Sequence, residues 1–253
     1  MDPASLENVL CKRDLGAVLT MCSTCVACSS EEDFDALLTR VAALLGFEFL
    51  LYAHQMTSYQ RPKPVKLVNI SNPKPWMDEY NKRNYVENDP VRLELEVRLA
   101  DNEETGVIHW DAYERELSAP ELEIISRRRH YGLEYGFSAY CNSSKHDSVF
   151  LVSFASAGRR PDRRAKLMAG FLVKHLGRAR KYLDLFSLVS TLTPGEQRIA
   201  QWLVEGKSNW EIAKITGVSE STVKYHVANI LKKTGSNSRQ RAVAILIAER
   251  YLS

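Results

Sequence analysis

The sequence predicts an α+β N-terminal domain, in which helices flank an antiparallel sheet, followed by an all-α four-helix C-terminal domain with a helix-turn-helix. Up to about residue 190, apolar runs of strand length alternate irregularly with amphipathic segments of helix length, which differs from a regular βαβ series. Beyond that point, capping boxes and a glycine turn mark short helices. A chain of 253 residues can bury two cores. We therefore expect domains at 1–175 and 192–253, joined by a linker at 176–191.

The composition is that of an ordinary folded protein, with 45% hydrophobic and 26% charged residues. The N-terminus lacks the basic and apolar regions of a secretory signal, and no stretch is apolar for the roughly 18 residues of a membrane span. We therefore expect a cytoplasmic protein without a membrane partner. From Ser190 onward, nine Lys/Arg face five Asp/Glu, so the basic excess lies in the C-terminal part. This charge distribution favours a polyanionic partner there.

The first expected helix runs from Leu15 to Cys28 and carries Cys22 and Cys25 as well. Five cysteines are an odd number, and a cytoplasmic location disfavours disulfides. A metal cluster needs a fourth thiolate, for which only Cys11 and Cys141 remain. We interpret the three helical cysteines as small core residues and expect no metal site; metal or redox chemistry is the alternative.

The remaining elements of the first domain follow from periodicity and caps. Ser29 or Ser30 caps a helix with a regular apolar face, and Gly46 ends it. We expect strands at 47–54, 66–70, 136–139 and 148–155, with a Pro-rich loop through Pro62 and Pro64 and a polar turn at 142–147. Further helices are expected at 76–85, 91–99, 121–131 and 162 to about 188. Together they form the α+β arrangement.

Two capping boxes open the C-terminal domain. Thr193-x-x-Glu196 and Ser208-x-x-Glu211 each precede a short apolar-periodic segment. The second of these helices, 209–215, ends at the short turn Thr216-Gly217-Val218-Ser219, which is typical of a helix-turn-helix.

The helix that follows Ser219 has one apolar and one polar face. The apolar stripe consists of Val223, Val227, Ile230 and Leu231. On the other face, Lys224 can donate to a guanine, and Tyr225 and Ala228 permit a close approach to the groove. The residues predicted to contact phosphates are Ser219, Ser221, Thr222, Lys232 and Lys233. An ordinary solvated basic face is the alternative interpretation.

This region resembles the LuxR-type helix-turn-helix. The resemblance rests on Leu192-Thr193-Pro194-Gly195-Glu196, on Gly206-Lys207-Ser208-x-x-Glu211-Ile212-Ala213, and on Val218 to Lys224 followed by His226, Asn229 and Ile230. It departs from the family at Ala200, usually Leu, and at Gly195, often basic. The resemblance implies a DNA-binding transcriptional regulator.

The first domain resembles, more sparsely, the autoinducer-binding domain of quorum-sensing LuxR regulators, through Trp76-x-x-x-Tyr80, Asp89-Pro90-Val91, Trp110 and Gly136-Phe137. The resemblance implies an N-acyl homoserine lactone as effector and no other cofactor. By resemblance, Trp76 donates to the lactone carbonyl and Asp89 accepts the ligand amide. Tyr80 and Ser153 donate to the acyl carbonyl, and Trp110 packs on the lactone ring.

Plainer interpretations exist for the same residues. Trp76 and Tyr80 are also typical core aromatics, and Asp89 before Pro90 is a typical helix N-cap. Three features depart from the family: Asn72 in place of Tyr, Tyr140 in place of Pro, and about six inserted residues around 100–105.

Two other functions stay open beside a ligand-gated regulator. One is a ligand-independent DNA-binding factor whose N-terminal domain serves dimerisation or protein interaction, which Asn72 and Tyr140 favour. The other is an enzyme, which is disfavoured because the sequence has no paired-histidine metal motif and no G-x-S-x-G elbow. We therefore expect no catalytic residues.

A last expectation concerns assembly. The helix after Ser238 carries apolar residues in excess of what a small module needs, namely Ala242, Ile245, Leu246 and Ala248. This predicts a homodimer on an inverted-repeat DNA site, with RNA polymerase as a further partner.

Overall fold

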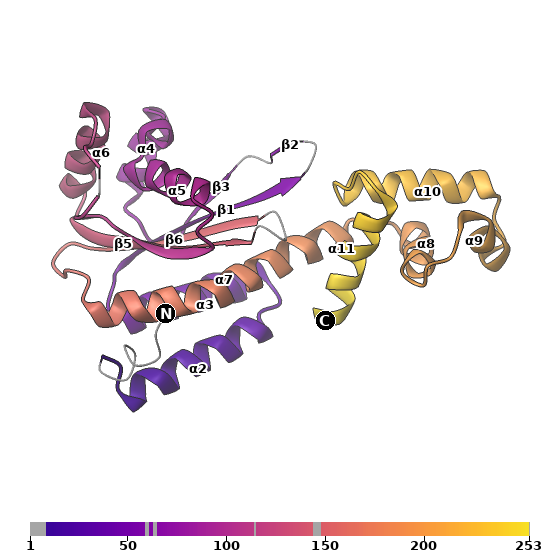
Figure 1. The fold of residues 1–253 in the computed structure, drawn as a ribbon, viewed down its shortest axis with the longest axis horizontal. Helices are drawn as coiled ribbons and strands as arrows, with labels where there is room; N and C mark the ends of the chain where they lie inside the picture. Colours follow the sequence, from indigo (N-terminus) through magenta and orange to yellow (C-terminus); the bar gives the residue numbers. More distant parts are fainter. Residues whose placement is uncertain (1–8, 59–60, 63–64, 114, 144–147, 253) are drawn as a thin grey trace. The chain divides into compact units, whose positions relative to one another are not determined.

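The computed structural model describes residues 9–58, 61–62, 65–113, 115–143 and 148–252 (Figure 1). Its contacts divide the chain into two compact units. The first comprises residues up to Met56 and Lys63–Arg180, and the second comprises Thr57–Pro62 and Lys181–Ser253.

The first unit is built on an antiparallel sheet with the strand order β1-β6-β5-β4, in which β3 also pairs with β1; the end of β1 pairs with the two-residue strand β2. The strands are β1 (Phe49–Ser58), β2 (Arg61–Pro62), β3 (Lys66–Asn69), β4 (Thr105–His109), β5 (Tyr135–Ser143) and β6 (Ser148–Ser156). In the register of the sheet, Ser153 of β6 lies between Leu51 of β1 on one side and Ser138 of β5 on the other. The expected antiparallel α+β architecture is confirmed.

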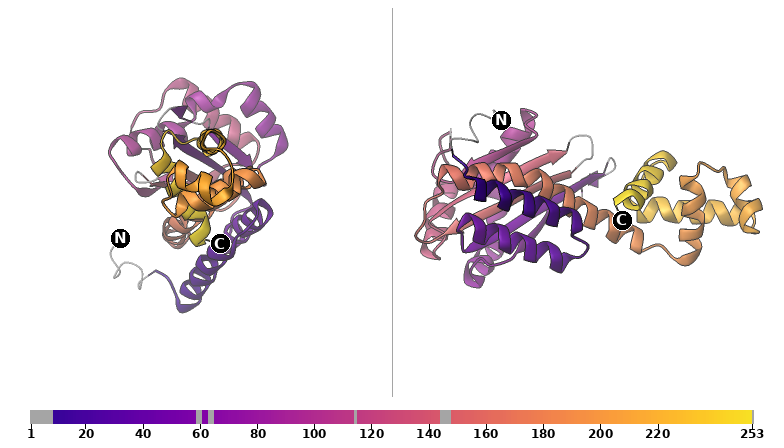
Figure 2. Two further views of the ribbon diagram at one scale, coloured as in Figure 1. Left: turned by 90° about the vertical axis from the view of Figure 1, so that its right-hand side faces the viewer. Right: turned by 90° about the horizontal axis from the view of Figure 1, so that it is seen from below.

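Helices cover both faces of this sheet (Figures 1 and 2). One face is covered by α3 (Glu31–Leu45) and the first part of α7 (Arg163–Ser190), and α2 (Lys12–Ala27) packs against α3 on the side away from the sheet. The other is covered by α4 (Lys74–Lys82), α5 (Pro90–Ala100) and α6 (Ala119–His130), with a short 3₁₀ turn, η1 (Tyr85–Asn88), after α4.

Alternation along the central strand β6 creates two separate cores. Phe150 packs against Phe34 of α3, with ring centroids 6.0 Å apart. Leu151 belongs instead to the cluster that contains Trp76 of α4 and Ile124 of α6. Since successive strand residues point to opposite faces, residues 149, 151 and 153 face the layer formed by α4, α5 and α6.

Caps fix the helix ends where the sequence predicts them. Ser30 Oγ accepts from the Asp33 amide and Asp33 bonds back to Ser30, which starts α3. Gly46 ends α3 in the left-handed conformation, at φ 81°. The predicted long helix is also confirmed as α7.

Three sequence expectations need correction. Strand β4 lies in a segment for which no strand was expected, because its pattern is short and contains Gly106. The single helix expected at 76–85 is α4 followed by η1, since Asn84 adopts the left-handed conformation and breaks it. The first helix begins three residues early, at Lys12, where Asp14 accepts from the Cys11 amide. Pro64 and most of the turn at 142–147 lie outside the described residues.

The second unit contains four short helices beyond the end of α7: α8 (Pro194–Val204), α9 (Asn209–Thr216), α10 (Glu220–Lys233) and α11 (Arg239–Leu252). Both predicted capping boxes form, at Thr193 and Ser208. Gly217 ends α9 at φ 73°, which confirms the glycine turn. Ile199, Ile212, Val223 and Ile230 are buried in a common core.

The segment at 176–191, expected as a linker, is helical up to Ser190 and belongs to α7. Leu176, Ala179 and Leu183 within it are buried. Among the described residues, none of the helices combines the length and the apolar composition of a transmembrane segment.

Candidate functional site

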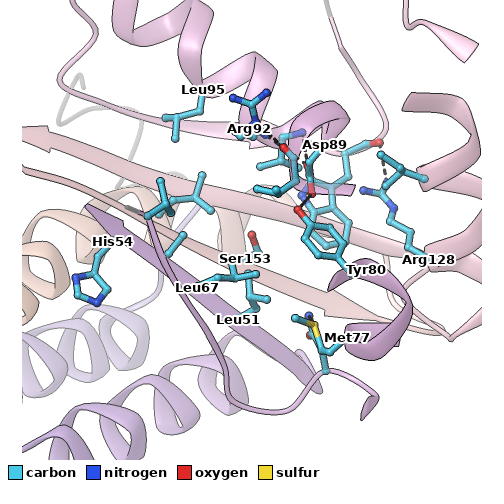
Figure 3. Close-up of a pocket in the computed structure, with 18 of the residues that line it drawn as sticks. Leu51, His54, Leu67, Met77, Tyr80, Asp89, Arg92, Leu95, Arg128 and Ser153 are labelled. Atoms are coloured by element: carbon cyan, nitrogen blue, oxygen red, sulfur yellow. Dashed lines mark hydrogen bonds between the residues drawn. The ribbon is translucent and has the colours of Figure 1, made fainter. Parts of the chain in front are cut away.

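A cavity of about 310 Å³ lies between the sheet and the layer of α4, α5 and α6 (Figure 3). Strand residues whose side chains face this layer form its floor, among them Leu51, Ala53, Leu151 and Ser153. The helices supply most of the other walls. A volume of this size suits a small amphiphilic molecule.

The cavity has a polar end and a predominantly apolar end. Figure 3 shows Tyr80, Asp89 and Arg128 near the first, and Leu67 and Leu95 toward the second, where His54 also lies. A molecule with a polar head and an apolar tail therefore matches the lining.

Asp89 performs two structural tasks at the polar end. Its Oδ1 accepts from the Val91 amide at 2.8 Å and from the Arg92 amide at 3.4 Å, which caps α5. Its Oδ2 accepts from the Tyr80 hydroxyl at 2.7 Å. Burial and the Asp89 carboxylate raise the pKa of Tyr80, so its hydroxyl stays protonated as a donor. The N-cap interpretation is confirmed, and Oδ2, which accepts from one donor only, keeps a lone pair for a ligand.

Trp76 is part of an aromatic cluster beside this pair. Its ring lies 5.6 Å from Tyr80, 5.9 Å from Tyr85 and 5.8 Å from Tyr131, measured between centroids. Among the described residues, nothing accepts a hydrogen bond from its indole N–H. Trp76 is therefore both a core aromatic and a donor without a protein partner in that part of the chain.

A hydrogen-bonded chain joins Trp110 to Ser153. The Trp110 indole donates to Ser138 Oγ at 2.9 Å, and Ser138 Oγ lies 2.8 Å from Ser153 Oγ. Since Ser138 Oγ already accepts from Trp110, we assign the Ser138 hydroxyl as the donor and Ser153 Oγ as the acceptor of the bond between them. The Ser153 hydroxyl then keeps its own proton for an acceptor in the cavity.

Gly136 makes room for Trp110. A Cβ at residue 136 would fall 2.5 Å from the Trp110 ring and 2.7 Å from the Phe154 carbonyl oxygen. Only glycine permits this approach, which explains why a Gly precedes Phe137 in the motif.

The structure thus brings the five predicted ligand-binding residues to a single cavity: Trp76, Tyr80, Asp89, Trp110 and Ser153. Their individual contacts with a ligand stay predictions. Asn72 also lines the cavity, whereas Tyr140 is fully buried and is not among the lining residues.

Two residues of this site were missed in the sequence. Ser138 faces the helical layer because it lies opposite Ser153, and alternation along 136–139 could have revealed it. Arg128 lines the cavity although it stands in the run Arg127-Arg128-Arg129, which in sequence is typical of a solvated helix surface. Only the packing of α6 distinguishes it.

Of the three cysteines expected in the core, Cys22 of α2 is only half-buried, whereas the other two behave as core residues. Cys25 and Cys28 are buried, and burial raises the pKa of both thiols, to about 12 for Cys25 and about 11 for Cys28. They are therefore protonated thiols at neutral pH and poor metal ligands in this state. Within the described ranges, no group of His, Cys, Asp or Glu is arranged to hold a metal ion.

In the second unit, α10 presents the polar face predicted for DNA. Ser219 caps the helix by accepting from the Thr222 amide at 3.1 Å, and its hydroxyl also contacts Ser221 and Thr222. The outward residues Ser221, Lys224, Tyr225, Ala228 and Lys232 are exposed, while Val223 and Ile230 are buried. The predicted two-faced helix is confirmed, and the base and phosphate contacts stay predictions.

Lys233 differs from its neighbour Lys232. Its ammonium donates to Glu196 Oε2 at 2.6 Å and to the Thr191 carbonyl at 2.9 Å. It therefore joins α10 to the start of α8, and any phosphate contact competes with this pair.

The argument for a dimer from α11 also needs correction. Ala242 and Leu246 are buried in the core of their own unit, so they are not surplus apolar surface. Ile245 is half-buried, and the side chain of Ala248 lies outside the described part.

Two family models match the chain. Residues 30–179 match the autoinducer-binding domain, and residues 190–246 match the bacterial regulatory proteins of the luxR family. The two matches together span most of the chain.

Named relatives are similar over nearly the whole length. The transcriptional activator protein VanR of Vibrio anguillarum is 27% identical over 233 residues, which cover 89% of this chain and 93% of the relative. The transcriptional activator protein LuxR of Aliivibrio fischeri is 26% identical, with 86% and 87% covered.

Solved structures share the fold. SdiA in complex with octanoyl-rac-glycerol has a TM-score of 0.55 at 20% identity and covers 96% of this chain and 98% of that one. Escherichia coli SdiA in another structure has a TM-score of 0.54 at 21% identity, with 94% and 99% covered. The chain belongs to the LuxR family of bacterial transcriptional regulators and combines an autoinducer-binding domain with a DNA-binding helix-turn-helix.

Proposed function

We propose that this regulator binds an N-acyl homoserine lactone in the cavity of its first unit and thereby controls DNA binding by its second. The cavity itself is the observation that carries the proposal, because it has a polar end and an apolar end inside an autoinducer-binding domain. In this proposal Trp76 and Ser153 donate to the ligand carbonyls, and Asp89 accepts the ligand amide.

The cavity also favours this function over a ligand-independent factor. That alternative supposes that the protein has lost its ligand pocket, because Asn72 and Tyr140 differ from the residues expected in the family. Asn72 lies in the wall of a cavity that is still open, and Tyr140 lies outside the lining. Neither departure fills the site.

We further propose that the protein acts as a homodimer on an inverted-repeat promoter site in the cytoplasm, where it contacts RNA polymerase. Exposed Lys224 on a helix built for the major groove supports DNA readout. A two-fold dimer matches an inverted repeat, since each protomer presents one recognition helix to one half-site.

The test combines the purified full-length protein with a series of N-acyl homoserine lactones of different chain length and 3-substitution. Melting temperature reports binding, mass spectrometry reports whether the lactone stays intact, and a gel shift on promoter DNA reports the response. We expect stabilisation by at least one lactone, no turnover, and changed DNA affinity. Absence of stabilisation across the series would contradict the ligand, and lactone consumption would indicate an enzyme.

A further inference from the structure

Arg128 is a buried cation in the wall of the cavity. Its side chain extends from α6 and is 5% exposed. The guanidinium lies over the Trp110 ring, 4.2 Å from the centroid, and Nη2 donates to the Trp110 carbonyl at 3.3 Å. Figure 3 shows it at the end of the cavity that holds Tyr80 and Asp89.

This guanidinium lacks the partner that neighbouring arginines have. Arg127 pairs with Glu79, and Arg115 pairs with Glu121. No carboxylate of the described residues pairs with Arg128, and its Nε is buried without a hydrogen-bond partner there.

Nearby groups compensate the charge only in part. Asp89 is close enough to act on Arg128 but is already bonded to Tyr80 and to the start of α5. Burial lowers the pKa of Arg128 despite this neighbour. An unpaired buried charge is costly, and contact with the Trp110 face offsets a small part of that cost.

A second buried donor lies beside it. The Tyr113 oxygen is near enough to accept from the Arg128 guanidinium, but the Tyr113 hydroxyl proton has no acceptor among the described residues. The Arg128 Nε–H and the Tyr113 O–H are therefore two neighbouring buried donor groups without an acceptor in that part of the chain, which indicates that an acceptor is supplied from outside the protein.

We propose that Arg128 binds a carboxylate of the ligand, so that the pocket prefers N-acyl amino acids, including ring-opened N-acyl homoserine, to the neutral lactone. The inference rests on the proposed function, because the ligand amide still bonds to Asp89 and the acyl chain still occupies the apolar end. A carboxylate has the charge and the two equivalent acceptor oxygens that a guanidinium fork prefers, whereas a lactone is neutral and its ring oxygen is a poor acceptor.

The test measures binding of two ligands that differ only in ring opening. N-octanoyl-homoserine lactone and N-octanoyl-homoserine are titrated into the full-length protein by calorimetry, in slightly acidic buffer that slows ring opening. We expect the wild-type protein to bind the carboxylate at least about tenfold more tightly, since hydrogen bonds between two charged groups are stronger than those to a neutral acceptor. Arg128→Met should lose this preference and keep the lactone affinity within about threefold.

Two further variants keep the test decisive. Arg129→Gln alters an exposed arginine on the same helix and should change neither affinity. Arg128→Lys keeps the charge but loses the fork, so the carboxylate preference should fall without disappearing. A structural role for Arg128 predicts a lower melting temperature for unliganded Arg128→Met, whereas an uncompensated charge predicts an unchanged or higher one.

The outcomes separate this inference from the proposed function. If the lactone binds and the carboxylate does not, the inference alone is wrong. An unchanged ligand preference in Arg128→Met also overturns it. If neither ligand binds the wild-type protein, both the inference and the lactone proposal fail.

Discussion

The Tyr140 hydroxyl on β5 donates to the Glu103 carboxylate, which lies just before β4. By the family resemblance, Tyr140 stands where a proline is expected, and Glu103 lies in the segment around 100–105 that we interpret as an insertion. Gly106 lies directly opposite Tyr140 in the register of β4 and β5. A Cβ at residue 106 would fall 2.6 Å from the Tyr140 oxygen and 2.8 Å from its ring. The two positions where we expect departures from the family are therefore in direct contact.

We predict that Gly106→Ala destabilises the protein much more than Tyr140→Phe. The alanine overpacks a fully buried ring and should cost about 2 kcal/mol of unfolding free energy. Tyr140→Phe removes a single hydrogen bond to a half-exposed carboxylate and should cost about 1 kcal/mol or less. Denaturant unfolding of both variants measures the difference.

The pair Gly106→Ala with Tyr140→Leu provides the control. Its cost should be smaller than the sum of the two single changes, because the added methyl group enters space that the ring has left. Additive costs would show that the two residues do not share this space. Ligand affinity should be unchanged, since neither residue lines the cavity.

The fold was largely predictable because its signals are local. Capping boxes at Ser30, Thr193 and Ser208 and glycines at 46 and 217 mark helix ends through bonds within a few residues. Strand β4 was missed because its identity depends on pairing with β5, some 30 residues away. Local patterns do not contain such pairing.

The site was predictable only where a motif covered it. Trp76, Tyr80 and Asp89 were found through family spacing, and the structure adds that Asp89 bonds to Tyr80. Arg128 could not be found, because a cation in an arginine run is usually solvated, and its burial depends on how α6 packs against Trp110.

We predict that Asp89→Asn weakens ligand binding while the fold survives. Asparagine caps a helix nearly as well as aspartate, so the melting temperature without ligand should change little. The ligand amide loses a charged acceptor, so the affinity of the variant for the lactone should fall about tenfold. Asp101→Asn, at the exposed other end of α5, is the matched control. Unchanged lactone sensitivity in Asp89→Asn would remove Asp89 from the ligand site.

We predict that Glu121 stabilises the fold only above acidic pH. Its hydrogen bonds with Arg115 and Ser118 hold its pKa at about 2, below the usual 4.5. A lowered pKa gives stability that is fully present above the unfolded value and is lost as pH falls toward 2. Glu121→Gln keeps the capping ability and removes the charge.

The variant should therefore be about 2 kcal/mol less stable near pH 7, and the difference should shrink between about pH 5 and pH 2. Solvent screens part of the attraction between Glu121 and Arg115, because the Arg115 side chain is partly exposed. Denaturant unfolding across this range measures it, with Glu134→Gln at an exposed position as the control. A difference that is independent of pH would contradict an ionic role.

Lys224 and Lys232 should fail differently on DNA. Lys224 pairs with Glu220 at 3.1 Å, but both side chains are largely exposed, so the pair is weak and can open toward a base. Lys224→Ala should cost about 1 to 3 kcal/mol of binding free energy on the operator and relax preference at one position per half-site. Lys232→Ala should weaken operator and scrambled DNA alike and reduce the salt slope by about one. Lys233 is not a suitable phosphate control, because its loss also breaks the pair with Glu196.

The measurement compares Lys224→Ala and Lys232→Ala on operator and scrambled DNA at two salt concentrations, with operator half-sites about 10 bp apart. Equal losses on both DNAs for Lys224→Ala would show that Lys224 reads no base.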